Sequence, residues 1–400
     1  MDPQTRLLPS GPRPGRESGR PEPAGTASGL LPRALQALRS AGPAPGSRIV
    51  AAMSGGVDSS VMAVLLHRAD FEVLGVSMQL FDKGGRGAEG GCCTLDDFQD
   101  ARRVAFEAGF PHYVVDFEAR FRETVIDAFV EGYLAGETPS PCIRCNQHVK
   151  FRTLLERAEA LGAGYVATGH YARIRRDARG HHLLKATDPA KDQSYFLFSH
   201  TQQTLARTLF PLEGFTKTEV RELGRELGLH LAEKPESQEI CFVGEGRYDA
   251  FIAAEGRDPG GGPGEVRHVE DGRVLGRHEG HWRYTRGQRR GLGVAHGEPL
   301  YVVRTEPAAN VVWAGPEAAL YGSECEAREV SWCLEPPAGP LACAAKVRSR
   351  SEPAEALVIP LGSGRVKVAF ASPQRALTPG QAVVFYRDDE VLGGGWITGA

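Results

Sequence analysis

The chain has 400 residues and a formal net charge of −3 at pH 7, with 41% hydrophobic and 24% charged residues. This length suits two or three domains, and the composition is typical of a soluble globular protein without the apolar run of ~20 residues that spans a membrane. The eight cysteines are too sparse for a secreted disulfide scaffold, so close-set cysteines favour catalysis or metal binding. Because the net charge is slightly negative, any nucleic acid would have to be bound by local basic patches.

Residues 1–47 are rich in Pro, Gly, Ser, Ala and Arg and lack a sustained apolar period. This composition predicts a mostly disordered N-terminal extension, with a short helix around 30–38. An organellar transit peptide is the competing interpretation, and the acids Asp2, Glu17 and Glu22 argue mildly against it. No pattern of a secretory signal peptide is visible.

Residues 48–254 alternate between strand and helix signals. Apolar runs predict strands at 49–53, 73–79, 111–116 and 164–168, and helical periodicity is found at 61–66, 101–107, 121–134, 151–160 and 217–227. Such alternation is typical of parallel β-α-β units. We therefore predict an α/β domain with a doubly wound, Rossmann-like parallel sheet.

Beyond residue 254 the helical signal fades. The glycine-rich stretch 258–265 predicts a linker, and short strand-like segments follow at 300–304, 310–313, 357–359, 366–370 and 382–386. We predict a small central domain over 255–320 and a C-terminal β-barrel over 321–400.

A glycine-rich loop, Ser54-Gly55-Gly56-Val57-Asp58-Ser59-Ser60, joins the first predicted strand to the first predicted helix. The glycines let the backbone approach a phosphate, the start of the helix favours an anion, and the two serine hydroxyls after Asp58 can add hydrogen bonds. Asp58 is a candidate Mg²⁺ ligand or positioning group. Since the Lys of a kinase-type P-loop is absent, the loop favours nucleotidyl transfer, although a simple strand-to-helix turn is the alternative. It resembles the PP-loop of the ATP pyrophosphatase superfamily, whose members adenylate a substrate oxygen and release pyrophosphate.

The cysteines fall into four groups. Cys142 and Cys145 form a C-x-x-C, which suits a redox pair, half of a zinc site or part of an iron–sulfur site, and Cys241 lies alone. The adjacent Cys92 and Cys93 are compatible with structural or functional roles. The cysteines that we expect to be inert small hydrophobes are Cys325, Cys333 and Cys343.

Several motifs in one order carry a closer resemblance. They are Thr138-Pro139-x-Pro141 followed by Cys145-Asn146, Thr168-Gly169-His170-Tyr171-Ala172-Arg173, Lys191-Asp192-Gln193-Ser194-Tyr195-Phe196-Leu197, Ile240-Cys241-Phe242, and Tyr284-Thr285-x-Gly287-Gln288-Arg289-x-Gly291-Leu292-Gly293. Together they resemble the tRNA-specific 2-thiouridylases (MnmA/TrmU), from about residue 48 to Leu392-Gly393-Gly394-Gly395.

That resemblance implies a reaction. In the family, ATP adenylates the C2 oxygen of the wobble uridine in tRNAs for Lys, Glu and Gln, and a protein persulfide delivers sulfur to C2. Cys241 corresponds to the cysteine that carries the persulfide, and Cys145 to the nucleophile that attacks it, with a transient disulfide between them. The implied partners are tRNA and a sulfur-donor protein, either a cysteine desulfurase or a relay protein, in a bacterial cytoplasm, and no membrane is expected.

The resemblance also implies binding residues. For ATP, with Mg²⁺, they are Ala52, Met53, Ser54, Gly55, Gly56, Val57, Asp58, Ser59, Met78 and Gly169, with Met78 against the adenine. The residues expected to touch the target base are Ser140, Pro141 and Cys142. Other expected tRNA contacts are His170, Lys191, Asp192, Gln193, Arg348, Ser349 and Gln381. The cations Lys191 and Arg348 suit phosphates.

Cys142 departs from the family pattern, because many members carry Asp there. Cys142, Cys145 and Cys241 would together suit a four-iron four-sulfur cluster, as in related tRNA thiolases, so cluster-dependent thiolation is one alternative. Another is a PP-loop enzyme that uses ammonia, such as an amidating synthetase or a tRNA lysidine synthetase. A third is a non-catalytic RNA-binding protein that holds ATP as a ligand.

Overall fold

The computed structural model describes residues 29–81, 95–235, 240–243, 248–256 and 262–399. Its contacts divide the chain into two compact units. Unit 1 comprises Met1–Arg122, Asn146–Ser194 and Gln202–Glu245, and unit 2 comprises the rest, Glu123–Cys145, Tyr195–Thr201 and Gly246–Ala400. The polypeptide therefore passes between the units several times.

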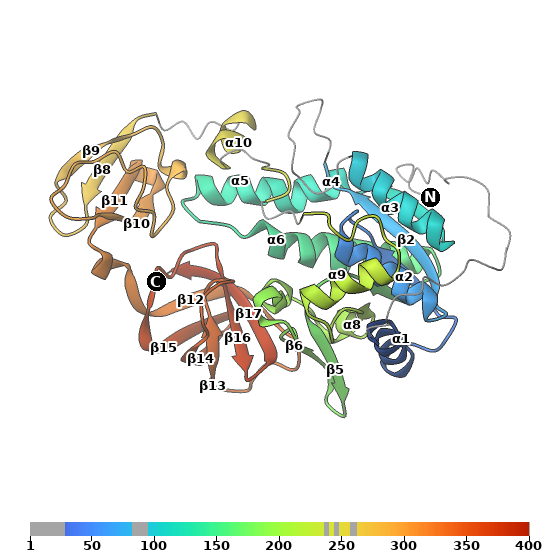
Figure 1. Ribbon diagram of the computed structural model, residues 1–400. Coiled ribbons are helices and arrows are strands. Elements are labelled where there is room, and N and C mark those ends of the chain that lie inside the picture. Colours follow the sequence, from blue (N-terminus) through green and yellow to red (C-terminus); the bar gives the residue numbers. More distant parts are fainter. Residues whose placement is uncertain (1–28, 82–94, 236–239, 244–247, 257–261, 400) are drawn as a thin grey trace. The chain divides into compact units, whose positions relative to one another are not determined.

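Unit 1 is built on a five-stranded sheet in the order β3-β2-β1-β4-β7, in which every pairing is parallel. Figure 1 labels β2 of this sheet. The strands are β1 (Arg48–Ala52), β2 (Glu72–Gln79), β3 (His112–Asp116), β4 (Tyr165–Ala167) and β7 (Thr208–Leu209). The main helices of its core are α2 (Val57–Arg68), α3 (Leu95–Ala108) and α9 (Lys217–Glu226). The predicted parallel α/β sheet is confirmed, because buried apolar strands alternate with helices.

Two longer helical runs contain π-helical turns. The first joins α4 (Glu118–Phe121), η1 (Arg122–Ile126) and α5 (Asp127–Leu134). The second joins α6 (Pro141–Arg144), η2 (Cys145–Thr153) and α7 (Leu154–Ala160). The helices predicted at 121–134 and 151–160 are thus confirmed as parts of longer runs, and the π turns, which are frequent at functional sites, were not predicted.

Smaller elements complete this part of the chain. An antiparallel hairpin that the sequence analysis missed joins β5 (Arg173–Asp177) to β6 (Gly180–Leu184). The 3-10 turns η3 (Pro189–Lys191) and η4 (Ser194–Leu197) and the helix α8 (Gln202–Leu205) follow it.

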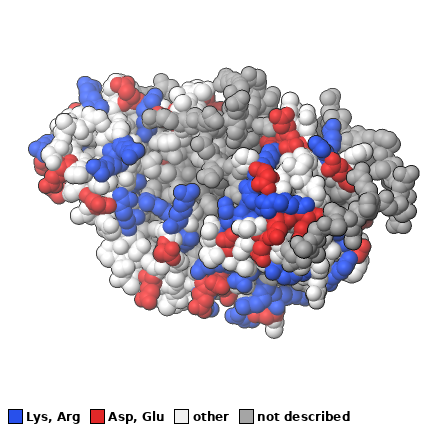
Figure 2. Space-filling model, in the orientation of Figure 1, with Lys and Arg blue, Asp and Glu red and all other residues white. Residues whose placement is uncertain are grey.

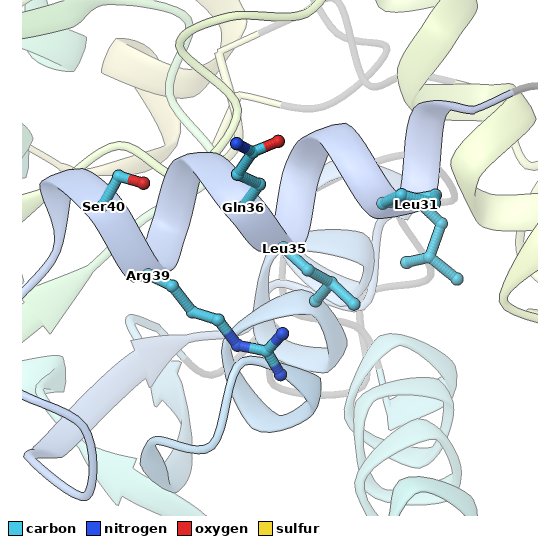
Figure 3. Close-up of a pocket in the computed structure, with 6 residues that line it drawn as sticks. Leu31, Leu35, Gln36, Arg39 and Ser40 are labelled. Carbon is cyan, nitrogen blue, oxygen red and sulfur yellow. The ribbon is translucent and has the colours of Figure 1, made fainter.

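The short helix predicted around 30–38 is confirmed as α1 (Leu30–Ala41), within a segment that was otherwise expected to be disordered. Its Leu30 and Ala34 side chains are buried in the core of unit 1, which explains why this part of the extension is ordered, while residues 1–28 lie outside the described chain. Figure 3 shows the side chains that line a shallow pocket along α1, including Leu31, Leu35, Gln36, Arg39 and Ser40. Because one helix alone provides this lining, the pocket lacks the converging polar groups of a nucleotide site.

The part of unit 2 that precedes its C-terminal strands, from residue 248 to residue 320, contains α10 (Tyr248–Ala254) and a four-stranded sheet in the order β10-β11-β8-β9. The strands are β8 (Gly264–His268), β9 (Val274–His278), β10 (Tyr301–Glu306) and β11 (Val311–Gly315). The 3-10 turn η5 (His281–Arg283) lies between β9 and β10, η6 (Pro307–Ala309) between β10 and β11, and η7 (Glu317–Leu320) after β11. The linker predicted over 258–265 is wrong at its end, since Gly264 begins β8. A Cβ at Gly264 would collide with the Asn310 carbonyl and the His278 ring, so this glycine reflects close packing.

The C-terminal part of unit 2 is a closed antiparallel barrel of six strands, in the order β12-β15-β14-β13-β16-β17, with β17 paired back to β12. The strands are β12 (Tyr321–Trp332), β13 (Leu341–Lys346), β14 (Ala354–Gly362), β15 (Arg365–Arg375), β16 (Ala382–Arg387) and β17 (Glu390–Gly399). Val358, Val368, Phe385 and Ile397 are fully or almost fully buried in its core. The predicted C-terminal β-barrel is confirmed.

In the described parts of the chain, no helix combines the length and the apolar character that a bilayer crossing requires.

Candidate functional site

The glycine-rich loop leaves the carboxyl end of β1 and leads into α2, as predicted. Gly55 has a φ of 74°, and a Cβ there would collide with the backbone of Asp97. Gly56 has an ordinary φ of −95°, and the nearest atom to an added Cβ would be Ser54 Oγ at 3.6 Å. The two glycines therefore differ: Gly55 is needed for the fold of the loop, and Gly56 leaves open space beside the start of the helix, where a phosphate would approach.

The loop serines bond within the loop. Ser59 Oγ accepts a hydrogen bond from the Ser54 N–H at 3.1 Å and donates one to the Gly56 carbonyl at 3.1 Å. Ser60 is fully buried, so its hydroxyl does not reach a ligand, contrary to our expectation for this residue. The donors left for an anion are the backbone N–H groups at the start of α2.

Asp58 is held by two partners of unit 1. Lys217 Nζ, at the first position of α9, contacts both carboxylate oxygens at 2.7 and 2.8 Å, and the Tyr171 hydroxyl donates to Oδ1 at 2.9 Å. An added Cβ on Gly169 would lie 3.1 Å from the Asp58 carbonyl carbon and the Ser59 nitrogen. The structure thus brings the Thr168-Gly169-His170 turn against the loop, as the resemblance implied. With both oxygens engaged, Asp58 has the environment of a positioning group.

A second lysine, Lys234, supports the other side of the loop. Its Nζ donates to the Gly55 carbonyl at 3.0 Å, to Asp97 Oδ1 at 2.8 Å and to Asp100 Oδ2 at 2.6 Å. Partial burial lowers the pKa of Lys234, but the hydrogen bonds to Asp100 and Asp97 outweigh it and raise this pKa above its ordinary value. Lys234 therefore stays charged and ties the loop to α3.

Both lysines were missed by the sequence analysis, which noted only that the loop itself lacks a Lys. They lie 159 and 179 residues from the loop residues that they contact. One signal for Lys217 was available in the sequence. Thr216 and Glu219 form a capping box, which predicts that Lys217 is the first residue of a helix. Nothing local indicated Lys234.

A hydrogen-bonded pair fixes the strand end before the loop. Ser77 Oγ donates to the Met53 carbonyl at 2.8 Å, so it accepts from His112 Nε2–H at 2.9 Å. Burial lowers the pKa of His112 to about 4, which keeps the ring neutral near pH 7. Ala52 and Met78 lie at the carboxyl ends of β1 and β2, the edge of the sheet from which the loop emerges.

The expected tRNA contacts in unit 1 are partly engaged by the protein. Asp192 Oδ1 accepts from the Ala186 and Ser194 N–H groups at 3.0 and 3.1 Å, and Gln193 Oε1 accepts from the Tyr171 N–H at 2.9 Å. His170 Nδ1 lies 2.8 Å from Thr168 Oγ1, and Lys191 ends the turn η3. Asp192 and Gln193 therefore stabilise their own loop, whatever else they contact.

The C-x-x-C segment lies at the start of the second helical run. Ser140 is the N-cap of α6, with Pro141 in its first turn, and Cys142 is exposed, whereas Cys145 is buried at the start of the π-helix η2. Gln381, 243 residues away from Thr138, donates to the Thr138 carbonyl at 2.7 Å. The barrel residue expected to contact tRNA is therefore bonded to the chain two residues before the segment expected to contact the target base.

Arg144, between the two cysteines, is held by the barrel. Its guanidinium makes two hydrogen bonds to Glu329, at 2.7 and 3.1 Å, and lies 4.3 Å from the centre of the Trp396 ring. Glu329 has a φ of 50°, at a break in the register between β12 and β17. Bulges of this kind re-aim side chains, and a positive φ at a non-glycine residue costs about 1 kcal/mol or more. A strained residue of the barrel, Glu329, thus holds Arg144 and with it α6 in place.

A cavity of about 320 Å³ opens beside this segment in unit 2. Apolar residues such as Phe129 and Pro141 form part of its wall, and Arg144 and Arg328 bring charge to it. Arg328 contacts Glu137 at 3.0 Å. The cavity combines apolar and aromatic side chains with guanidinium groups, which are the groups on which bases stack.

Cys241 lies in a turn of unit 1, closed by a hydrogen bond from the Val243 N–H to the Ile240 carbonyl at 3.0 Å. Phe242 is buried with its ring 5.8 Å from that of Phe121, in an edge-to-face arrangement, and Cys241 is half-buried. The phenylalanine anchors the turn that presents the cysteine. Cys145 belongs to unit 2.

The remaining cysteines divide as follows. Burial raises the pKa of the Cys325 and Cys333 thiols to about 12 and that of Cys343 to about 11, which agrees with inert small hydrophobes. Cys92 and Cys93 lie outside the described residues. Within the described ranges, no three His, Cys, Asp or Glu side chains are arranged to hold a metal ion.

Lys and Arg side chains are interspersed with Asp and Glu on the face that Figure 2 shows. This mixture fits the slightly negative net charge, so anion binding must depend on particular arrangements of residues.

A parallel sheet with a glycine-rich anion loop, followed by two β domains, defines a HUP-type nucleotide-binding protein. Three family models match in succession: a tRNA methyl transferase HUP domain over residues 47–245, a tRNA methyl transferase PRC-barrel domain over 251–316 and an aminomethyltransferase β-barrel domain over 322–397.

Among curated relatives, the tRNA-specific 2-thiouridylase MnmA of Geobacter metallireducens is 52% identical over 359 residues, which cover 88% of this chain and 97% of the relative. That of Rickettsia massiliae is 48% identical over 355 residues, with coverage of 88% and 97%. The chain belongs to the MnmA family of tRNA-specific 2-thiouridylases. A solved U34-tRNA thiolase, NcsA from Methanococcus maripaludis, is 17% identical, with a TM-score of 0.36 over 56% of this chain and 71% of its own, which is too distant to support an argument.

Proposed function

We propose that the protein is an ATP-dependent tRNA 2-thiouridylase that replaces O2 of the wobble uridine in tRNAs for Lys, Glu and Gln with sulfur. The main support is the 52% identity to a relative named for this activity, along 97% of that relative. An intact phosphate loop and the two cysteines Cys145 and Cys241 supply the groups that the reaction needs. The proposed adenylation domain spans 48–254, the central domain 255–320 and the barrel 321–400.

In the adenylation half-reaction, the proposed loop residues 52–59 bind the phosphates of ATP, with Met78 and Gly169 beside its nucleoside. The uridine O2 attacks the α-phosphorus, and pyrophosphate leaves. The open side of Gly56 and the N–H groups at the start of α2 orient the phosphates. Lys217 and Lys234 hold the loop in shape through Asp58, Asp97 and Asp100.

Mg²⁺ is part of the proposal only as a companion of ATP. Asp58, the one loop carboxylate, is bound by Lys217 and Tyr171. It therefore does not offer the open oxygen ligands that Mg²⁺ prefers, and ATP phosphates and water would provide most of the coordination.

In the sulfur half-reaction, Cys241 carries a persulfide that a cysteine desulfurase or relay protein supplies. The Cys145 thiolate attacks Sγ of Cys241, the S–S bond of the persulfide breaks, and the released hydrosulfide attacks C2 of the activated uridine. AMP leaves, 2-thiouridine forms, and a Cys145–Cys241 disulfide remains until a thiol reductant restores both thiols. The bacterial cytoplasm, where thiols are kept reduced, is the proposed location.

The proposed target-base contacts are Ser140, Pro141 and Cys142, which precede the proposed nucleophile by a few residues. The other proposed tRNA contacts are His170, Lys191, Asp192, Gln193, Arg348, Ser349 and Gln381. The hydrogen bond from Gln381 to Thr138 supports placing the last of these beside the target-base segment.

A four-iron four-sulfur cluster on Cys142, Cys145 and Cys241 is the competing route. Anaerobic purification followed by iron and sulfide analysis separates the two. Colourless, iron-free protein that thiolates tRNA at the full rate supports the persulfide, whereas activity that scales with iron content supports the cluster.

The decisive experiment incubates wobble-uridine tRNA with the protein, ATP and a cysteine desulfurase system, and then measures nucleosides by mass spectrometry. We expect 2-thiouridine with the wild type and with Cys343→Ser, a matched control in the barrel, and none with Cys145→Ser or Cys241→Ser. An ammonia-using enzyme would remain active in both of the latter variants. A non-catalytic RNA-binding protein would release no pyrophosphate from ATP and tRNA.

A further inference from the structure

Three arginines of unit 2 converge on one turn of the barrel, residues 375–378. Arg286 comes from the segment after η5, Arg348 follows β13, and Arg375 ends β15. Arg286 Nη1 donates to the Leu377 carbonyl at 2.7 Å, and Arg348 Nη2 donates to the neighbouring Ala376 carbonyl at 2.9 Å. Arg375 belongs to the turn itself. Segments almost ninety residues apart thus bring three guanidinium groups together.

Gly287 shows how close these groups lie. An added Cβ on this glycine would be 3.6 Å from Arg375 Nη1 and 4.0 Å from Arg348 Nη2. Gly287 has a φ of 88°, which favours glycine, and its N–H is bonded to the Val302 carbonyl at 2.8 Å. The absence of a side chain at this position leaves room between the two guanidinium groups.

The turn is built from a strained residue. Ala376 is buried and has a φ of 52°, a conformation that costs a non-glycine residue about 1 kcal/mol or more. Its carbonyl receives both the Arg348 guanidinium and the Thr378 hydroxyl, the latter at 2.8 Å. Strain of this kind persists where the surroundings require a particular arrangement of groups.

The charges of the three arginines are only partly compensated. Arg375 contacts Glu317 at 3.0 Å. Within the described residues, the hydrogen-bond partners of Arg286 and Arg348 are backbone carbonyls and one hydroxyl, and no carboxylate forms an ion pair with either. Arg286 Nε is buried there without an acceptor. The cluster therefore has more positive charge and more donors than its protein neighbours satisfy.

The pKa directions agree with this geometry. Burial lowers the pKa of Arg286, and repulsion from Arg348 lowers it further. Burial likewise lowers the pKa of Arg348, and repulsion from Arg375 adds to it. The folded protein holds like charges close together at a cost, which an anion bound between them would offset.

We propose that Arg286, Arg348 and Arg375 form one binding site for a phosphate group of the tRNA backbone. Guanidinium forks match phosphate oxygens in geometry as well as in charge, and three of them around one open position suit a single phosphodiester. The assignment rests on the proposed function, which supplies the RNA. The family resemblance implied only Arg348 and Ser349 here, so Arg286 and Arg375 are new assignments.

The test measures binding of unmodified tRNA as a function of KCl concentration. The variants are Arg286→Gln, Arg375→Gln and Arg286→Lys, and the matched control is Arg365→Gln, which removes an exposed arginine from the same strand as Arg375. We expect each Gln variant to raise the Kd roughly ten-fold at low salt and to reduce the slope of log Kd against log [KCl] by about 1. Arg286→Lys keeps the charge but loses the forked guanidinium, so its Kd should lie between those of the wild type and Arg286→Gln.

The proposal is overturned if the Kd and salt slope of the Gln variants equal those of the control. Among the described residues, the Arg375 guanidinium bonds to the exposed Glu317 carboxylate and to no backbone carbonyl. Arg375→Gln therefore decides the matter even if Arg286→Gln fails to fold in a thermal melt. Wild-type binding and thiolation in the same preparations separate the two proposals, because an inactive wild type refutes the proposed function, whereas an active wild type with unaffected Gln variants refutes only this site. Weaker binding to the desulfurase with unchanged tRNA binding would identify an acidic protein partner instead and would also overturn it.

Discussion

The phosphate loop of unit 1 and the arginine cluster of unit 2 have opposite electrostatic designs. Beside the loop, Lys217 is paired with Asp58, and Lys234 with Asp97 and Asp100. In the cluster, two of the three arginines are bonded to backbone carbonyls and a hydroxyl, without a carboxylate in the described chain. One region neutralises its cations internally, and the other keeps positive charge available.

This difference matches what each region has to bind. Nucleotidyl transfer needs the phosphates of ATP in one orientation and then has to release pyrophosphate, so fixed backbone N–H groups serve better than an excess of cations. An RNA backbone is a repeated anion that has to be held without base specificity, for which guanidinium charge is the effective group. The lysines of unit 1 therefore shape the site, and the arginines of unit 2 are the proposed binding groups.

The largest expected effect distinguishes the two glycines of the loop. Gly55→Ala places a Cβ at a φ of 74° and against the Asp97 backbone, so we expect at least 3 kcal/mol less stability and no ATP binding. Gly56→Ala meets no atom nearer than 3.6 Å, so it should melt like the wild type but bind ATP at least ten-fold more weakly. Thermal melts and ATP titrations of both variants check this.

Equal loss of stability in the two variants would show that both glycines serve the fold. Unchanged ATP affinity of a folded Gly56→Ala protein would remove Gly56 from the phosphate site.

A second prediction concerns the paired lysine. The Lys217 side chain is only 10% exposed, so Lys217→Met leaves Asp58 with an unpaired, partly buried carboxylate and should cost about 2–3 kcal/mol. The matched control on the same helix is Arg225→Met, whose ion pair with Glu233 is exposed on both sides and should be worth less than about 1 kcal/mol. Denaturant unfolding measures both.

The double variant Lys217→Met with Asp58→Asn tests the pairing itself. Because the neutral amide needs no cation, the double variant should be more stable than the sum of the single losses predicts. Additive losses would contradict a positioning role for this pair.

Much of the fold could be predicted from periodicity. The buried strands β1 to β4 are short apolar runs between helical segments, which is the pattern of a parallel sheet. The barrel strands were predicted only in part, because the sequences of β12 and β17 mix glycine, charged and apolar residues and lack a clear alternation. Gly264 was interpreted as part of a linker, but this position requires glycine because the Asn310 carbonyl lies against it and leaves no room for a side chain.

The candidate site could be predicted only where its residues are local. The loop carries its own signature in consecutive residues, but Lys217 and Lys234 reach it through the tertiary fold. Likewise, Gln381 carries no local signal for its contact with Thr138, and only the family resemblance indicated its importance. The contacts that hold Arg144, with Glu329 and Trp396, depend on a bulge at Glu329. No residue type in the sequence predicts a bulge of this kind.

The third prediction concerns the contacts of Arg144 with Glu329 and Trp396. Arg144→Lys loses the bidentate contact with Glu329 and the stacking on Trp396, so we expect about 1–2 kcal/mol less stability and a several-fold lower kcat for thiolation. KM for tRNA should change little if Arg144 only positions α6. The control Arg304→Lys alters a pair in β10, with Glu306, in which the guanidinium likewise lies over a tryptophan ring, that of Trp313. A raised KM with unchanged kcat would mean that Arg144 contacts the RNA directly.

The smallest expected effect is a pH dependence from unit 1. Burial holds the pKa of His112 at about 4, below its ordinary value of 6.5. Above pH 6.5 its contribution to stability is fully present. As the pH falls from 6.5 towards 4, the unfolded chain binds a proton that the folded protein excludes, so stability is lost. Between pH 7 and pH 5.5 this loss should be about 1 kcal/mol for His112 alone.

His112→Asn isolates this term, because the amide can still donate to Ser77 but does not titrate. We expect the variant to lose about 1 kcal/mol less stability than the wild type between pH 7 and pH 5.5. The buried His200, whose pKa is lowered to about 3 by burial, has the same sign and is present in both proteins, so it cancels in the comparison. If stability fell equally with pH in the wild type and in His112→Asn, the pKa of His112 in the folded protein would not be lowered. The hydrogen bonds from His112 through Ser77 to Met53 would then not be the buried support of the loop described above.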